Sequence, residues 1–159
     1  MIFVTVGSQM PFDRLIQTVD EWAAERGRRD VFAQTAGGDY KPVQIQSIDF
    51  LDTDEFDSHF KRANVIVGHA GTGTILTALQ LCKPVLVMPR RAALGETRND
   101  HQVATADRFG KSGRIAVAMN EAELRLALDD LSSLKVATAI GPHAEPELLQ
   151  AIRSFIVKA

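Results

Sequence analysis

Short apolar segments rich in β-branched residues recur along the chain, and each is followed by a turn and a segment whose apolar residues have helical spacing. The apolar segments cover residues 2–6, 31–35, 64–68, 84–89 and 114–118, and residues 43–51 alternate as a half-buried strand does. Helical spacing follows over residues 12–23, 54–62, 74–82, 99–109 and 120–131, and Pro146 stands at the first position of a final helix. Strands that are apolar throughout are buried on both faces, so we predict an α/β fold with a Rossmann-like, doubly wound, mostly parallel sheet.

The size of the chain predicts one domain. With 159 residues, of which 45% are hydrophobic and 24% charged, the chain can bury a core without disulfides or metal ions. Cys82 is the only cysteine, and the net charge of -2 gives no general attraction for nucleic acid. We find no signal-peptide pattern and no apolar run long enough to span a membrane, and we expect an irregular connection over residues 132–146.

The turn after residues 64–68 is the strongest local signal. It contains His69, Gly71, Thr72, Gly73 and Thr74, between a predicted strand and a predicted helix. Glycines let a ligand approach the backbone, and free amides at a helix start bind phosphate groups. A tight turn that only needs small residues is the alternative.

Two familiar nucleotide-binding motifs are incomplete in this sequence. The dinucleotide fingerprint would begin at Gly71 and Gly73, but its third glycine position holds Leu76. Residues 110–112 look like the end of a P-loop, but the first glycine of that motif would fall on Thr105. NAD binding is therefore disfavoured, and Gly110 and Gly113 are predicted to end a helix.

Two further turns contain candidate ligand-binding residues. After the first strand, Gly7, Ser8 and Gln9 could face the same ligand, or they form a plain turn before an early-helix acid. Asn99, His101 and Gln102 stand at a predicted helix start, where they could bind sugar hydroxyls or phosphate oxygens. In the alternative interpretation, Asn99 is a helix cap, and the side chains of His101 and Gln102 are exposed to solvent.

Arg90 and Arg91 follow the predicted strand over residues 84–89. Their guanidinium groups could bind a diphosphate or a carboxylate in bidentate geometry, and an exposed charge pair is the alternative.

The sequence gives no support for a metal site or a serine nucleophile. The histidines do not have the spacing of metal ligands, and these are His59, His69, His101 and His143. The G-x-S-x-G motif is absent. Cys82 falls at the end of the predicted helix over residues 74–82, where we expect it to belong to the core.

Together, these turns resemble a known family, the C-terminal, donor-binding domains of family 28 glycosyltransferases, which include the MurG-like enzymes. The resemblance covers most of residues 1–120, and it is carried by Gly7, Ser8 and Gln9, residues 11–15, residues 68–75, Lys83 with Pro84, and Asn99, His101 and Gln102. Within the family, the pattern is most similar to the small subunits of split glycosyltransferases. These include exopolysaccharide subunits of the PssE type and the eukaryotic subunit that adds the second N-acetylglucosamine to the dolichol-linked oligosaccharide.

The resemblance implies a single UDP-sugar donor-binding domain over residues 1–159, which is half of a GT-B fold. It implies the donor-binding catalytic subunit of a two-chain, inverting glycosyltransferase. Such an enzyme transfers a hexosyl or glycuronosyl group from a UDP-sugar to a polyprenyl-diphosphate-linked saccharide in polysaccharide biosynthesis. The partner would be a membrane-anchored, acceptor-binding subunit that supplies the general base and holds this chain at the cytoplasmic face of the membrane. No nucleic acid, metal ion or other cofactor is expected.

The resemblance also assigns roles to residues. It implies that His69 and His101 are catalytic and contact the donor phosphate or sugar. It implies that donor binding uses Gly7, Ser8, Gln9, Gly71, Thr72, Gly73, Thr74, Arg90, Asn99 and Gln102. Thr77 stands where MurG-like enzymes have a ribose-binding glutamate, which is a departure from the family pattern.

Two other functions are consistent with the residues alone. One is a non-catalytic nucleotide-binding or scaffolding module. The other is a self-contained small-molecule enzyme, such as an NAD-dependent or epimerase-like protein, and the incomplete glycine fingerprint disfavours it.

Overall fold

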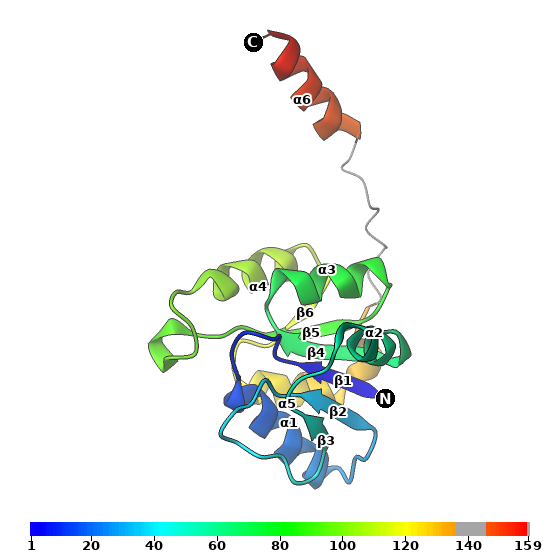
Figure 1. Cartoon of the computed structure of the whole chain (residues 1–159), viewed down its shortest axis with the longest axis vertical. Coiled ribbons are helices and arrows are strands. Elements are labelled where there is room, and N and C mark those ends of the chain that lie inside the picture. Colours follow the sequence, from blue (N-terminus) through cyan, green and yellow to red (C-terminus); the bar gives the residue numbers. More distant parts are fainter. Residues whose placement is uncertain (136–145, 159) are drawn as a thin grey trace.

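The computed structural model describes residues 1–135 and 146–158, and its centre is a six-stranded parallel sheet (Figure 1). The strands are β1 (Ile2–Thr5), β2 (Val31–Gln34), β3 (Gln46–Ile48), β4 (Val65–His69), β5 (Val85–Met88) and β6 (Ala116–Val117). They lie in the order β3-β2-β1-β4-β5-β6, and every neighbouring pair is parallel. This strand order is that of a Rossmann-like sheet, which confirms the predicted fold class.

The direction of winding reverses at β1. The chain first builds outward from β1 through β2 and β3, and it then returns to place β4 on the other side of β1. Thr5 is therefore paired with Gln34 on one side and with Gly68 on the other. A crevice opens at the carboxyl ends of the strands at such a reversal, so the turns after β1 and β4 face each other.

Helices cover both faces of the sheet (Figure 1). The helices are α1 (Asp13–Glu25), α2 (Thr53–Arg62), α3 (Thr72–Gln80), α4 (His101–Lys111) and α5 (Glu121–Asp129), with the short 3-10 turns η1 (Ala92–Leu94) and η2 (Leu131–Ser133). Side chains of α1 and α5 share one core with Val4, and side chains of α2, α3 and α4 share the other with Phe3. Consecutive residues of β1 thus enter opposite cores, which explains why Ile2, Phe3 and Val4 are all apolar.

The strand predicted over residues 43–51 is shorter than expected, because β3 contains only Gln46–Ile48. The carboxylate of Asp20 accepts the backbone N–H groups of residues 43–45 at 2.9–3.0 Å and the Tyr40 hydroxyl at 2.8 Å. Burial alone would raise the pKa of Asp20, but these hydrogen bonds outweigh it and hold the pKa below its usual range. Amides bound to a carboxylate are not available to a sheet, so the strand starts later.

The end of α3 differs from the prediction. The helix stops at Gln80, and Cys82 is an exposed residue in the left-handed region with φ of 51°. The N–H of Lys83 donates to the carbonyl of Ala78 at 2.8 Å, which closes the helix end. The expected core position of Cys82 is therefore wrong, because this residue terminates the helix.

The ends of α4 also differ from the prediction. The helix begins at His101 with Asp100 as N-cap, so Asn99 is one residue too early to be the cap. It continues through Gly110 to Lys111, so Gly110 does not end it. The predicted cap Asn120 is confirmed, because its side chain accepts the N–H of Glu123 at the start of α5.

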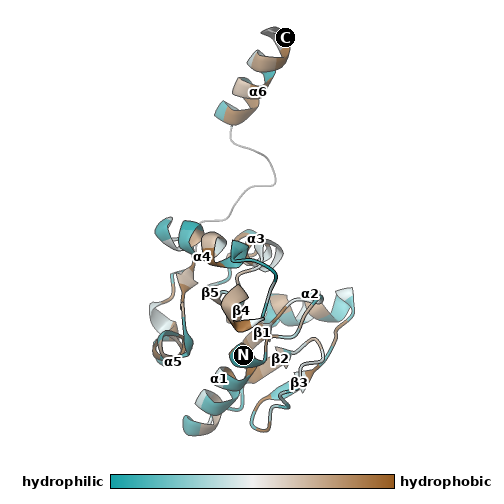
Figure 2. Ribbon diagram, turned by 90° about the vertical axis from the view of Figure 1, so that its left-hand side faces the viewer, coloured by the Kyte–Doolittle hydropathy of each residue, from teal (hydrophilic) through white to brown (hydrophobic). Residues whose placement is uncertain are grey.

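The last described helix is α6 (Pro146–Lys158), which begins at Pro146 as predicted. Much of its ribbon has the colour of hydrophobic residues (Figure 2). Five of its apolar side chains are 41–76% exposed, namely Leu148, Leu149, Ile152, Phe155 and Ile156. Among the described residues, no helix combines the length and apolar character that a membrane span requires. Most of the irregular connection predicted over residues 132–146 lies outside the described residues.

We predict that Asp20→Asn destabilises the fold by about 2 kcal/mol, because the new amide N–H₂ group faces donors and leaves buried N–H groups unpaired. Asp20 is only 4% exposed, so water cannot replace the lost acceptor. Urea denaturation monitored by circular dichroism measures the change. The matched control is Asp57→Asn on α2, whose exposed ion pair with Lys61 is worth at most about 0.5 kcal/mol. Equal stability of both variants would contradict this role of Asp20.

Candidate functional site

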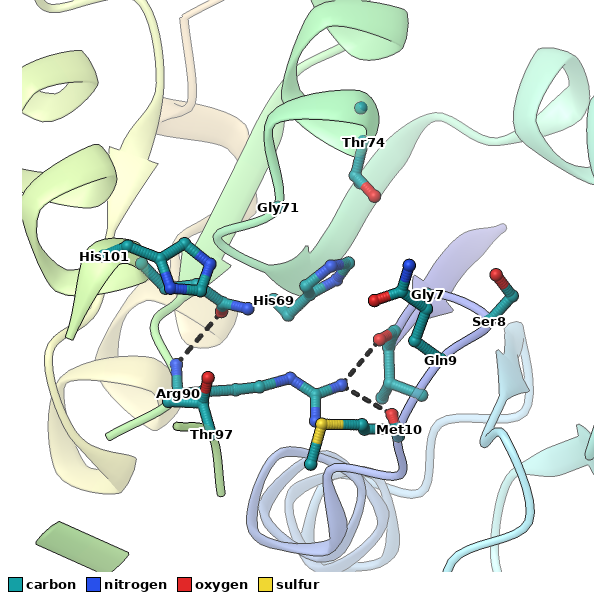
Figure 3. Close-up of a pocket in the computed structure, with 13 residues that line it drawn as sticks. Gly7, Ser8, Gln9, Met10, His69, Gly71, Thr74, Arg90, Thr97 and His101 are labelled. Carbon is teal, nitrogen blue, oxygen red and sulfur yellow. Dashed lines mark hydrogen bonds between the residues drawn. The ribbon is translucent and has the colours of Figure 1, made fainter. Parts of the chain in front are cut away.

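An open pocket of about 380 Å³ lies at the carboxyl edge of the sheet, where the turns after β1 and β4 face each other (Figure 3). It is lined by Val6, Gly7, Ser8, Gln9, Met10, His69, Gly71, Gly73, Thr74, Arg90, Thr97, His101 and Gln102. None of these lining residues is an aspartate or a glutamate. Among the described residues there is also no cluster of three or more metal-ligating side chains. Arg90 belongs to the lining, and its positive charge suits an anionic ligand.

His69, at the end of β4, lies between the two glycine turns (Figure 3). A Cβ atom on Gly7 would lie 2.9 Å from Cε1 of the imidazole, and a Cβ atom on Gly71 would collide with Nε2. Gly7 also has φ of 78°, in the region that favours glycine. Both positions need glycine because the imidazole occupies the space of their missing side chains.

The His69 ring is neutral at pH 7. Burial, followed by the nearby positive charge of Arg90, lowers the pKa of His69 to about 4. Its Nδ1 atom is buried and has no hydrogen-bond partner among the described residues. The ring therefore shapes the floor of the pocket and is not a source of positive charge.

Arg90, at the end of β5, is 3% exposed, so the expectation of an exposed charge pair is wrong for this residue. Its NH1 group donates to the carbonyl of Pro11 at 2.6 Å, and its NH2 group donates to the carbonyls of Val6 at 2.7 Å and Met10 at 2.6 Å. The guanidinium also lies 5.0 Å from the centre of the Phe12 ring. Arg90 thus holds the turn after β1 in place and puts a positive charge beside the pocket.

Two helices start at the pocket without a side-chain cap. The N-cap of α3 is Gly71 and the N-cap of α4 is Asp100, and neither side chain accepts a first-turn N–H. Away from this pocket, Asp52 caps α2 and Asn120 caps α5. Gly71, Gly73 and Thr74 line the pocket, so the first-turn amides of α3 are available to an anionic ligand there.

The start of α4 orients two polar side chains of the lining. The Oδ1 atom of Asn99 accepts the backbone N–H of His101 at 3.2 Å and also contacts Nδ1 of its ring. The Oε1 atom of Gln102 accepts the backbone N–H of Arg90 at 3.2 Å. His101 lines the pocket at the end opposite to Gln9 and Thr74 (Figure 3). Gln102 also belongs to the lining.

The loop between β5 and α4 is tied to α1 by Arg14. Its guanidinium donates to both carboxylate oxygens of Glu96 at 2.6 and 2.8 Å and to the carbonyl of Pro89 at 3.2 Å. Glu96 also accepts the N–H of Arg91 at 2.9 Å. Residues 11–15 therefore support the loop that carries Thr97 into the pocket.

The pocket brings together most of the predicted site residues. Ten of them line it: Gly7, Ser8, Gln9, His69, Gly71, Gly73, Thr74, Arg90, His101 and Gln102. Thr72 and Asn99 are exposed and lie outside the lining, although Asn99 orients His101. Val6, Met10 and Thr97 line the pocket and were not predicted. The only feature of the sequence that could have indicated them is their position directly beside the predicted turns.

A second pocket of about 260 Å³ shares the Gly7 and Ser8 turn with the first. Its other lining residues are Gln34, Leu51, Asp52, Thr53 and Phe56. Gln34 is 3% exposed, and its Oε1 atom has no hydrogen-bond partner among the described residues. The sequence analysis did not predict this pocket, because residues 54–62 indicate only a helix.

Comparisons with known proteins find a family model that covers most of the chain. The model described as "Glycosyltransferase family 28 C-terminal domain" matches residues 1–137. The UDP-N-acetylglucosamine transferase subunit ALG13 of Yarrowia lipolytica is 25% identical over 135 residues. This match covers 74% of the chain but 64% of the relative, so the chain spans less than two thirds of that protein.

Two solved structures share the fold. An NMR solution structure of ALG13 matches with a TM-score of 0.60 and 19% identity, over 95% of this chain and 93% of that chain. The crystal structure of MurG from Acinetobacter baumannii matches with a TM-score of 0.65 and 18% identity, over 99% of this chain and 49% of that one. The second match shows that the fold of this chain corresponds to about half of MurG.

We predict that Gly71→Ala destabilises the chain by about 1–3 kcal/mol, because the new methyl group collides with the His69 ring. The matched control is Gly73→Ala, where a Cβ atom meets nothing within 4 Å. This control should leave stability unchanged or raise it by up to about 1 kcal/mol, because alanine favours a helix. Thermal and urea denaturation of both variants provide the measurement. Equal effects at both positions would show that His69 does not occupy this space.

We predict that the His69 ring stays neutral from pH 8 to about pH 5 and titrates near pH 4. An unfolded histidine has a pKa of about 6.5, so the unfolded chain binds a proton first as the pH falls. The contribution of His69 to stability is therefore complete above about pH 6.5 and is lost as the pH falls toward 4. NMR titration of the ring nitrogens tests this, and a midpoint above about pH 6 would contradict the proposed burial.

Proposed function

Because the chain belongs to the glycosyltransferase family 28 C-terminal domains, we propose that it is the donor-binding subunit of a two-chain, inverting UDP-sugar glycosyltransferase. The single observation that carries the proposal is the acid-free pocket between two glycine turns, at the start of a helix without a side-chain cap. Such a site suits a diphosphate, because the amides and Arg90 supply positive charge and no carboxylate repels it.

The two pockets suit the shape of a UDP-sugar. They meet at Gly7 and Ser8, so a ligand with its diphosphate at this turn reaches into both. The second pocket combines the apolar side chains of Leu51 and Phe56 with the unpartnered amide oxygen of Gln34. A planar base with hydrogen-bonding edges fits this combination, and the sugar then lies toward His101 in the first pocket.

The residues of this chain would act on the leaving group. Breaking the bond between the sugar and the diphosphate releases negative charge, which the first-turn amides of α3 and the guanidinium of Arg90 stabilise. His69, which is neutral, would hold the two glycine turns at the distance that the diphosphate requires. His101 would contact the sugar, so its proposed role is to position the donor.

A second subunit would complete the enzyme. The relative in Yarrowia lipolytica is named a transferase subunit, and this chain covers only about half of the MurG structure. The missing half would bind a polyprenyl-diphosphate-linked saccharide, anchor the complex at the cytoplasmic face of a membrane, and supply the base that deprotonates the acceptor. Co-expression with such a partner should give sugar transfer only when both chains are present. Binding of UDP without transfer by any such pair would favour a scaffolding module.

We predict that Thr74→Val weakens the binding of UDP by about tenfold, because a hydrogen bond to a charged phosphate contributes about 1.5 kcal/mol. The Thr74 hydroxyl points into the pocket (Figure 3), and valine keeps the shape of the side chain. Isothermal titration calorimetry on the isolated chain measures the dissociation constant.

The matched control for this prediction is Thr72→Val, two residues earlier on α3 and outside the pocket lining. UDP affinity should change less than about twofold in this variant, because exposed substitutions away from the ligand have small effects. Equal losses in both variants would show that the helix start is perturbed and that Thr74 makes no specific contact.

A further inference from the structure

The loop between β5 and α4, residues 89–100, contributes to the lining of the first pocket. It carries Thr97 and leads directly into His101 of α4. Both side chains lie at the end of the pocket opposite to Thr74 (Figure 3). The proposed function puts the diphosphate at the glycine turns, so the position of this loop decides what the rest of a bound donor contacts.

The middle of this loop, residues 91–97, has little support from backbone hydrogen bonds. Where its backbone N–H groups donate to carbonyls, those carbonyls belong to the same loop. Two hydrogen-bonded contacts join it to described parts of the chain outside the loop. The NH2 group of Arg91 donates to the carbonyl of Met119 at 2.6 Å, and the carboxylate of Glu96 accepts two hydrogen bonds from Arg14 on α1. The shape of this segment therefore depends on side chains.

The contact between Arg14 and Glu96 fixes direction as well as distance. The Nε atom of Arg14 lies 2.6 Å from one carboxylate oxygen and its NH2 group lies 2.8 Å from the other, which is the bidentate geometry of a planar guanidinium. Hydrogen bonding to Glu96 raises the pKa of Arg14 above its usual range, so the guanidinium stays charged. Glu96 directly precedes Thr97, so any displacement of Glu96 moves Thr97 with it.

Neither side chain of this pair lines the pocket. The side chains of Arg14 and Glu96 are only 15% and 13% exposed, and the charge of each is compensated by the other. An ion pair that is mostly buried adds little stability over well-packed apolar side chains, because both charges lose their water. Its advantage over apolar packing is a defined geometry. The pair therefore suits a role in placing the loop.

We propose that Arg14 and Glu96 are positioning residues for donor binding. Their ion pair sets the place of Thr97, whose hydroxyl contacts the part of the donor beyond the diphosphate. This inference rests on the proposed function, because it takes the ligand to be a UDP-sugar. Arg14 thus contributes to affinity through Thr97 and touches no atom of the ligand.

The test measures dissociation constants on the full, isolated chain by isothermal titration calorimetry. The ligands are UDP, UDP-glucose, UDP-galactose, UDP-N-acetylglucosamine and UDP-glucuronate, and the UDP-sugar that binds most tightly is used for every variant. The dissociation constant of UDP divided by that of this UDP-sugar gives the advantage that the sugar confers. We expect this advantage to be about tenfold in the unsubstituted chain.

Two variants break the bidentate contact. Arg14→Lys keeps the positive charge but cannot hold both carboxylate oxygens in a fixed geometry. Glu96→Gln keeps the size of the side chain but replaces one acceptor by a donor that faces the guanidinium. In each variant the advantage of the UDP-sugar should fall about fivefold, and the affinity for UDP itself should change less than about twofold.

A double-mutant cycle separates positioning from a purely structural role. Thr97→Val removes the hydroxyl but keeps the shape of the side chain, and it should lower the advantage of the UDP-sugar about fivefold in the unsubstituted chain. In the Arg14→Lys background the same change should cost less than about twofold, because the hydroxyl has already left its place.

The matched control is Arg125→Lys. Arg125 also joins its helix to α1, because it donates to Glu25 at 2.8 Å and to Glu21 at 2.6 Å, but it lies outside the pocket lining. This variant should leave the advantage of the UDP-sugar unchanged. Urea denaturation of every variant shows that the chain used for calorimetry is folded.

The outcomes separate this inference from the proposed function. Arg14→Lys and Glu96→Gln variants that lose stability but keep the full advantage of the UDP-sugar would overturn the inference alone. Independent, additive losses from Arg14→Lys and Thr97→Val would also overturn it, as would equal affinity for UDP and all four UDP-sugars, or failure of both pair variants to fold. Failure of UDP itself to bind would overturn the proposed function and this inference with it.

Discussion

The burial of Arg90 is the constraint on which the rest of the site depends. A buried guanidinium needs acceptors for its N–H groups, and here three carbonyls from residues 6–11 supply them. The turn after β1 is thereby fixed against the end of β5, although β4 lies between β1 and β5 in the sheet. Carbonyls stabilise the cation without neutralising it, so its charge still acts on the pocket and lowers the pKa of His69. One side chain thus sets both the shape and the charge of the site.

Much of the fold could be predicted because it depends on local pattern. Strand β5 is apolar at every position, and the sequence correctly predicts Asn120 as the N-cap of α5 and Pro146 as the first residue of α6. The prediction for β3 failed because a distant group decides where this strand starts. The start of β3 depends on a carboxylate from α1, which lies more than twenty residues earlier in the chain. No local pattern around residues 43–51 reveals that contact.

For the site, too, some features could be predicted from the sequence and others could not. Glycine turns after two neighbouring strands were visible in the sequence, because the carboxyl ends of parallel strands meet at one edge. The reason for the glycines was not visible, since it is the His69 ring that fills the space beside Gly7 and Gly71. The state of Arg90 was also hidden, because its partners are backbone carbonyls, which every residue has. The roles of Thr72 and Asn99 depend on which way their side chains point, and spacing alone does not determine that.

The proposed reaction also sets where the acceptor must enter. In an inverting transfer, the acceptor oxygen attacks the sugar from the side opposite to the leaving diphosphate. The diphosphate would lie against the sheet edge and the start of α3, so the acceptor must approach from the open side of the pocket. None of the described lining residues is a carboxylate that could accept the proton of the acceptor hydroxyl. His69 is too deeply placed and too weakly basic for that task. Under the proposed function, the diphosphate would depart toward the sheet edge, and activation of the acceptor would depend on groups that a second subunit brings to the open side.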